Sequence, residues 1–303
     1  MLRPAHGKMY YLLLLIGILS ACASEPEVRF DETALRSDDQ DVLFATEFPV
    51  ASKEGALLRA AEARKEGELD KALFLYVKAL EFDPSDADLL AEIGHLHRLQ
   101  RNAQMAVRAY TLALAEKPDY ATVLEARGLL YLTHDENARA AVDLNRAVKV
   151  NGGTWPVHNA LGLLADRAGD HVAAQRHYSS ALELNPNSAD ILNNRGYSRF
   201  MSGDYTEAGR DLYEAAHTWG HKQAWVNLGA LYAHNGEYEM AIDALRNVLP
   251  GPEAFNIVAE KSIQNGDFDT AEYLLNEAIR LSPTYFPAAE ENLTKLKLQA
   301  AGS

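Results

Sequence analysis

The chain has 303 residues, a formal net charge of −14 and an apolar fraction of 48%. This acidic balance argues against nucleic acid as the main partner, because binding to phosphates needs a basic surface. Cys22 is the single cysteine, which excludes an intramolecular disulfide and a cysteine-based metal cage.

Residues 1–21 have the three parts of a signal peptide. Arg3 and Lys8 supply positive charge, residues 10–19 form an apolar run, and Ser20-Ala21 is a small-residue end. The run of ten apolar residues is shorter than the roughly 20 that a membrane-spanning helix needs. We therefore expect residues 1–21 to be a lipoprotein or secretory signal peptide.

The sequence Leu19-Ser20-Ala21-Cys22 matches the bacterial lipobox, in which a signal peptidase cuts before a cysteine that becomes lipidated. The alternative is an ordinary secretory signal followed by a chance cysteine. The lipobox predicts lipidation of Cys22, and two or more acyl chains would anchor the protein stably to a membrane. By resemblance to Gram-negative lipoproteins, Ala23 in place of an aspartate implies the outer membrane, on its periplasmic face.

Residues 22–52 read as the lipidated N-terminus and an acidic tether. This stretch is rich in Glu, Asp, Ser and Thr, and it shows no sustained helical pattern. Such a composition is typical of a solvated linker, which would let the folded part stand off the membrane. The remaining residues, 53–300, are expected to form one repeat domain.

A ladder of alanines organises residues 53–300. Successive members are 34 residues apart, and the last two intervals shorten to 33 and 30: Ala72, Ala106, Ala140, Ala174, Ala208, Ala241 and Ala271. A fixed period between 20 and 50 residues indicates a repeat architecture. The shortened interval between Ala241 and Ala271 is where we expect the array to depart from a uniform superhelix.

Each unit is predicted to be two antiparallel helices joined by a tight turn. Gly169 ends the first helix of the unit at residues 155–188, and Pro186 separates this unit from the next. A glycine in the first helix recurs opposite a large residue in the second helix. Close helix packing needs one bare position facing one large side chain. The glycines are Gly94, Gly128, Gly162, Gly196 and Gly229, and the large residues are Tyr110, Leu144, Tyr178, Leu212 and Leu245.

This pattern resembles the tetratricopeptide repeat (TPR), and the residues that carry the resemblance most fully are Trp225, Leu228, Gly229, Tyr232, Ala241 and Leu245. The resemblance covers residues 53–286 and implies an all-α fold. That fold would be a TPR superhelical solenoid of about seven helix-turn-helix repeats. Residues 286–298 are expected to form a C-terminal capping helix, with Leu293 and Leu296 facing inward.

The histidines and glycines suggest no catalytic or metal centre. His97 stands where the family usually has tyrosine, so we expect a packed core ring, and Gly220 interrupts the helix between His217 and His221. No nucleophile elbow, phosphate-binding loop or zinc-protease motif occurs. We therefore expect a non-enzymatic protein with no metal, no cofactor and no small-molecule substrate.

In the TPR fold the first helices line a concave groove, and the resemblance places a mixed set of amides and apolar side chains there. The predicted partner-binding groove consists of Leu129, Leu132, Asn159, Leu163, Asn193, Asn194, Tyr197, Phe200 and Asn227. Asparagine amides can bond to both the donor and the acceptor of an extended peptide backbone. The alternative is that Leu129, Leu132, Leu163 and Phe200 only pack neighbouring helices together. The four asparagines have no reason to lie in the core, which favours the groove.

TPR domains that grip the terminal carboxylate of chaperone tails place cations at set positions of successive units. Here Asn159, Gln223 and Asn227 stand at such positions, without positive charge. The resemblance therefore argues against a chaperone adaptor.

Among TPR lipoproteins, the chain resembles the TadD-type lipoproteins of tight-adherence (Flp) pilus systems. The resemblance rests on the lipobox, on Asn193-Asn-Arg-Gly-Tyr197, on Trp225-Val-Asn-Leu-Gly229 and on residues 281–293. It implies a scaffold that binds secretin or pilus-assembly components. Two alternatives remain open: a type IV pilus pilotin, and an adaptor for periplasmic proteases or cell-wall hydrolases.

Overall fold

The computed structural model describes residues 50–301, with side-chain detail to residue 298. The predictions made for the signal peptide, Cys22 and most of the tether lie outside these residues. The described part of the chain is all-α. Its helices form seven antiparallel pairs and a final single helix, which confirms the predicted fold class.

The helix pairs follow the predicted units closely. The pairs are α2 (Lys53–Lys65) with α3 (Leu69–Leu80), α4 (Ala87–Leu99) with α5 (Ala103–Glu116), α6 (Ala121–Thr133) with α7 (Asn137–Asn151), α8 (Trp155–Arg167) with α9 (His171–Leu184), α10 (Ala189–Ser202) with α11 (Tyr205–Tyr213), α12 (Lys222–His234) with α13 (Tyr238–Arg246), and α14 (Gly251–Asn265) with α15 (Phe268–Leu281). The last helix is α16 (Pro287–Ala301), and a π-helix, η2 (Glu214–Thr218), extends α11.

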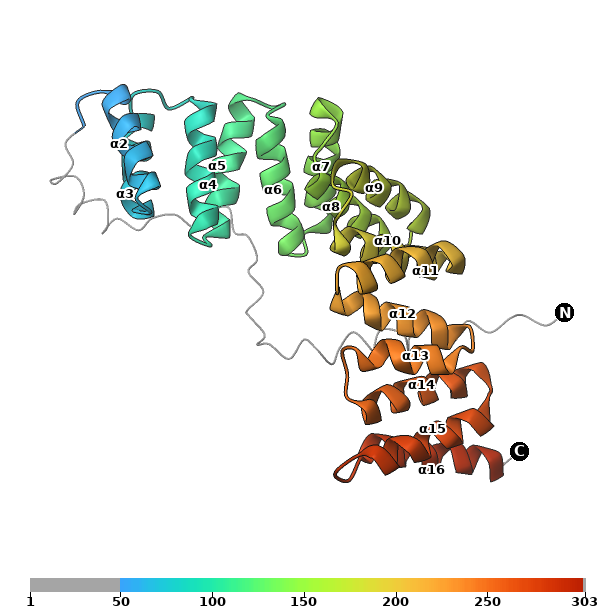
Figure 1. Cartoon of the computed structure of the whole chain (residues 1–303). Helices are drawn as coiled ribbons and strands as arrows, with labels where there is room; N and C mark the ends of the chain where they lie inside the picture. The colour runs from blue at the N-terminus through green and yellow to red at the C-terminus, as the bar shows by residue number, and fades with distance from the viewer. Residues whose placement is uncertain (1–49, 302–303) are drawn as a thin grey trace.

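The pairs stack into a curved array (Figure 1). In this view the helix axes run up the page from α2 to α7 and across it from α9 to α16. The direction changes near the α7–α8 junction, where both Gly152 and Gly153 have positive φ. The shortened interval between Ala241 and Ala271 coincides with a short second helix, since α13 has only nine residues. This short helix absorbs the missing residues, and α14 still stacks in line on α13.

The turn inside each helix pair needs one residue whose backbone lies in the left-handed region, with positive φ. Glycine supplies it in five units, with φ between 78° and 82° at Gly67, Gly169, Gly236 and Gly266 and 86° at Gly203. Arg101 and Asp135 take the same place in the other two units, with φ of 59° and 57°. A side chain in this region costs about 1–2 kcal/mol, because its Cβ approaches the following carbonyl.

Arg101→Gly is expected to raise the free energy of unfolding by about 0.5–1 kcal/mol. The substitution relieves the left-handed strain, and the greater freedom of glycine in the unfolded chain offsets part of that gain. Chemical denaturation followed by circular dichroism would measure the change. A decrease in stability would show that the Arg101 side chain stabilises this turn by more than the strain costs.

The glycines of the first helices accept the large side chains of the second helices, as predicted. A Cβ added at Gly162 would lie 2.5 Å from the ring of Tyr178, and one added at Gly94 would lie 2.5 Å from the ring of Tyr110. The corresponding distance from Gly229 to Leu245 is 2.8 Å. The ladder alanines themselves are fully buried, so the ladder is the spacing device of the array.

The third and fifth units each contain a buried ion pair, whose arginine also donates a hydrogen bond to the preceding unit. Asp143 accepts two hydrogen bonds from Arg127, whose third nitrogen donates to Thr111. The same arrangement recurs 68 residues later, where Asp211 accepts from Arg195, and Arg195 donates to Ser179 at 3.1 Å. Two of the seven units therefore share this arrangement, which the alanine ladder alone does not reveal.

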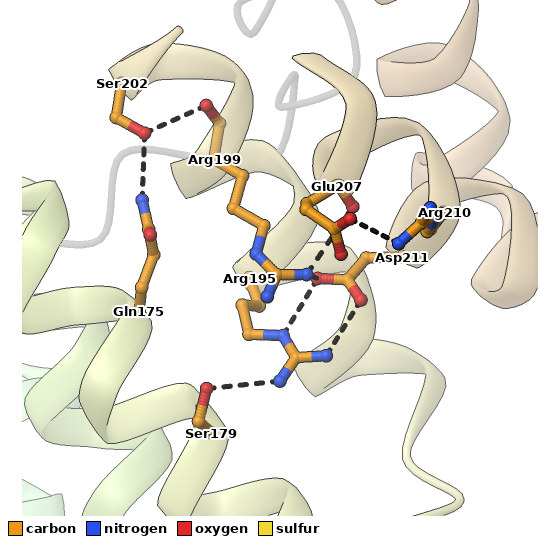
Figure 2. Close-up of polar contacts among 8 residues, drawn as sticks. All are labelled: Gln175, Ser179, Arg195, Arg199, Ser202, Glu207, Arg210 and Asp211. Carbon is orange, nitrogen blue, oxygen red and sulfur yellow. Dashed lines mark hydrogen bonds and ion pairs between the residues drawn. The ribbon is translucent and has the colours of Figure 1, made fainter. Parts of the chain in front are cut away.

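The fifth unit has an additional cation. Arg199 donates to Asp211 at 2.6 Å, so that one carboxylate joins two arginines of α10 to α11 (Figure 2). Asp211 is buried, and both arginine side chains are 18% exposed. Because these charges are largely removed from water, the cluster makes the fifth unit sensitive to loss of any one member.

Candidate protein-binding groove

The first helices of neighbouring units contact each other from α6 to α16. They form one continuous face of the array, which we call the first-helix face. A pocket opens on this face between α10, α12 and α14, with an enclosed volume of about 110 Å³. This is room for one large apolar side chain.

The pocket has mainly apolar walls with amides at its margin. Tyr197 and Phe200 come from α10, Val226 from α12 and Ile257 from α14. These four side chains are partly buried, so each exposes part of its surface to the pocket. The polar lining residues are Gln223, Asn227, Glu260, Lys261 and Gln264.

Rings extend from Phe200 toward the end of α12. The ring centroid of Phe200 lies 5.6 Å from that of His234, and Tyr205 lies 4.7 Å from His234. Burial, together with the charge of Lys261, lowers the pKa of His234. The lowered pKa favours the neutral imidazole, which packs as an aromatic ring against Phe200 and Tyr205.

The structure brings together only part of the predicted groove. Tyr197, Phe200 and Asn227 line the pocket. Leu129 lies in a separate hollow between α4 and α6, beside His95 and Arg98. The other predicted residues lie outside these two hollows: Leu132, Asn159, Leu163, Asn193 and Asn194. The pocket is thus formed by the first helices of the fifth to seventh units, whereas the sequence predicted a groove centred on the third to sixth units.

The four asparagines form a ladder that links neighbouring first helices. Asn194 donates to Asn159 at 3.2 Å, and Asn227 donates to Asn193 at 2.9 Å. The expectation that none of them lies in the core was wrong for Asn193, which is buried. Its side chain tolerates burial because its carbonyl accepts from Asn227 and its amide reaches Asn194. Some of the asparagine hydrogen-bonding groups that were predicted to bind a partner therefore bond to one another within the array.

Lys261 and Glu260 were missed by the sequence reasoning. Counting the seventh unit from Pro252, they occupy its tenth and ninth positions, outside the middle units in which the groove was predicted. The available signal was a lysine directly after a glutamate in a first helix with apolar neighbours. That pattern alone does not separate a pocket residue from a solvated one.

The histidines behave as structural rings. His97 is buried, as predicted, and its Nδ1 atom has no hydrogen-bond partner within the described residues. His217 packs against Tyr213 in a tilted contact and against Trp225 edge to face, whereas His221 bonds to Asp190. No group of three or more potential metal ligands occurs in residues 50–298.

None of the helices from Lys53 to Ala301 combines the length and the apolar character of a membrane span.

Comparison with known proteins identifies the repeats. Residues 159–220 and 222–249 match two family models, each described as a tetratricopeptide repeat. The BBSome complex member bbs-4 of Caenorhabditis elegans is 25% identical over 211 residues. The match covers 62% of this chain and 43% of that protein, so this chain spans less than half the length of the relative.

Solved structures agree on the fold. A tetratricopeptide repeat protein from Parabacteroides merdae superposes with a TM-score of 0.56 at 21% identity, over 81% of this chain and 98% of that one. YrrB, described as a TPR protein with an unusual peptide-binding site, superposes with a TM-score of 0.50 at 19% identity. That match covers 71% of this chain and 96% of YrrB. Residues 159–220 and 222–249 therefore match tetratricopeptide repeats, and the described part of the chain has the fold of a TPR solenoid.

Proposed function

We propose that this chain is a non-enzymatic scaffold that binds an extended segment of a protein partner on its first-helix face. The observation that carries the proposal is the pocket between α10, α12 and α14, with apolar walls and amides at its margin. Burial of apolar surface supplies about 25 cal/mol per Å². The amides of Gln223 and Gln264 can bond to a peptide backbone in either direction. YrrB, a TPR protein described as having an unusual peptide-binding site, has a similar fold, which supports peptide binding as the use of this fold.

The double substitution Tyr197→Ala with Gln223→Ala tests the pocket. We would pan a random-peptide phage library on the purified protein and measure the affinity of recovered peptides by fluorescence anisotropy. Loss of one aromatic wall and one amide is expected to weaken binding at least tenfold, about 1.4 kcal/mol. We choose Gln223 over Asn194, because Asn194 holds the asparagine ladder together.

Tyr273→Ala is the matched control. Tyr273 is 62% exposed and lies on a second helix, α15. Its loss should leave peptide affinity unchanged. Equal affinity of the control and the double variant for every recovered peptide would overturn the pocket as the binding site.

The finer proposal is that the scaffold works as an outer-membrane lipoprotein, on the periplasmic face, and assists secretin or pilus assembly in the manner of TadD-type proteins. It is supported by the lipobox ending at Cys22 and by the resemblance of the repeat segments. Deletion of the gene is expected to reduce secretin multimers and piliation. Normal multimers together with normal piliation would contradict this role and leave the binding pocket to another partner.

Cys22→Ala is expected to abolish lipid attachment, because the thiol is the only acceptor that the lipobox provides. Incorporation of a labelled fatty acid, followed by membrane fractionation, measures the effect. The wild type should be labelled and sediment with the outer membrane, whereas the variant should be unlabelled and released. Unchanged labelling of the variant would contradict the lipobox assignment.

A further inference from the structure

Lys261 is a cation at the pocket wall, which also carries the carboxylate of Glu260. It is partly buried on α14, and its Nζ atom donates to Gln264 at 3.2 Å. No ion pair of the described residues includes it. Burial lowers the pKa of Lys261. A partly desolvated ammonium group with only a neutral partner would be stabilised by an incoming anion.

The nearest carboxylate along the helix is already engaged. Glu260 Oε1 accepts from Asn292 at 2.8 Å and from Asn256 at 3.1 Å. The Asn292 bond joins α16 to α14, the Asn256 bond lies within α14, and the two together hold the Glu260 carboxylate in place. Glu260 therefore leaves Lys261 without a direct ion-pair partner, although its charge also faces the pocket.

The cation and the apolar walls belong to one pocket. Lys261 lines the same hollow as Phe200, Val226 and Ile257. A ligand that fills the hollow with an apolar side chain would bring the atoms next to that side chain close to Lys261. The pocket thus favours a ligand that carries an apolar side chain and an anionic group within one or two residues of each other.

We propose that the pocket recognises an internal Asp or Glu side chain directly beside a bulky apolar residue in an extended partner segment. The apolar side chain enters between Tyr197, Val226 and Ile257, and the carboxylate pairs with Lys261. This inference rests on the proposed function of the first-helix face. A side-chain carboxylate is favoured over a chain terminus because the face continues on both sides of the pocket, toward α8 and toward α16. The single positive charge of Lys261 is also sufficient to pair with a single carboxylate.

The negative net charge of the protein disfavours nonspecific binding of acidic peptides. The chain has a formal net charge of −14, so its long-range field repels acidic peptides. Enrichment of acidic peptides would therefore have to come from a local contact. Basic peptides, in contrast, are the expected product of nonspecific attraction, and they provide an internal control in any selection.

The test uses the random-peptide selection and one substitution. Peptides recovered on the wild-type protein are expected to contain Asp or Glu next to Leu, Ile or Phe. A recovered peptide would be synthesised with an amidated C-terminus, so that its internal acid is the only carboxylate at the site. Lys261→Met keeps the apolar stem of the side chain and is expected to weaken binding about tenfold. Lys149→Met, at an exposed position on α7, changes the net charge equally and should have no effect.

A double-mutant cycle isolates the contact. Replacing the peptide acid by its amide should weaken binding to the wild type about tenfold and to Lys261→Met hardly at all. Two results would overturn the inference: binding peptides that need Tyr197 but carry no acid, and equal losses from the amide peptide in both proteins. A peptide that binds only with a free C-terminal carboxylate would also overturn it, in favour of terminus recognition. Peptides that bind without regard to Tyr197 would instead contradict the proposed function itself.

Discussion

Asp211→Ala is expected to lower the free energy of unfolding by about 3–5 kcal/mol, the range for breaking a buried ion pair by removing one partner. Asp211 accepts from Arg195 at 2.8 Å and from Arg199 at 2.6 Å (Figure 2). Without this carboxylate, two largely buried guanidinium groups face each other with no opposite charge between them. Urea denaturation followed by far-ultraviolet circular dichroism measures the loss. Because each repeat contacts only its neighbours, the fifth unit should unfold first.

Asp190→Ala is the control for the loss of an aspartate. Asp190 is 82% exposed and pairs only with His221, so its removal should cost less than about 1 kcal/mol. Asp143→Ala, where a single arginine is left unpaired, should also be strongly destabilising. Equal stabilities of the Asp211→Ala and Asp190→Ala variants would contradict the structural role of the arginine cluster.

Gly162→Ala is expected to destabilise the protein by about 1–3 kcal/mol, although alanine favours helices over glycine by about 1 kcal/mol. The added methyl group would lie 2.5 to 2.8 Å from three atoms of the Tyr178 ring. Tyr178 is fully buried, and its hydroxyl donates to Asp166 at 2.9 Å, so the ring cannot move aside cheaply. Differential scanning calorimetry would detect the change as a lower melting temperature.

Gly209→Ala provides the matched control within a helix. The nearest atom to its added Cβ is in Leu231, at 3.4 Å, which is an ordinary contact. Here helix propensity should prevail, and the variant should gain up to about 1 kcal/mol. If Gly162→Ala were as stable as Gly209→Ala, close packing at Gly162 would not be what requires glycine there.

The fold was predictable because the repeat fixes both spacing and residue type. Gly162 and Tyr178 are 16 residues apart, as are Gly94 and Tyr110, and the same interval recurs wherever a glycine meets a large residue. A packing pattern that recurs in successive units can be recognised from the sequence alone. The capping helix followed the same logic, and Leu293 and Leu296 are buried as expected.

The groove was harder to predict because its polar residues serve two purposes. An asparagine in a first helix can face a partner or bond to the next helix, and Asn193 does the latter. The choice depends on the distance between neighbouring helices, which composition does not encode. Lys261 was missed for a related reason: whether a lysine is solvated or partly buried depends on the curvature that brings α10, α12 and α14 around it.

Photo-crosslinking tests most directly the claim that the partner binds on the first-helix face. A selected peptide would carry a photoreactive group at its apolar position, and mass spectrometry would locate its attachment sites. The account predicts attachment to α10, α12 and α14, near Tyr197, Val226 and Ile257. Attachment mainly to the exposed rings of Tyr213 and Trp219, which are 52% and 46% exposed beside η2, would contradict it.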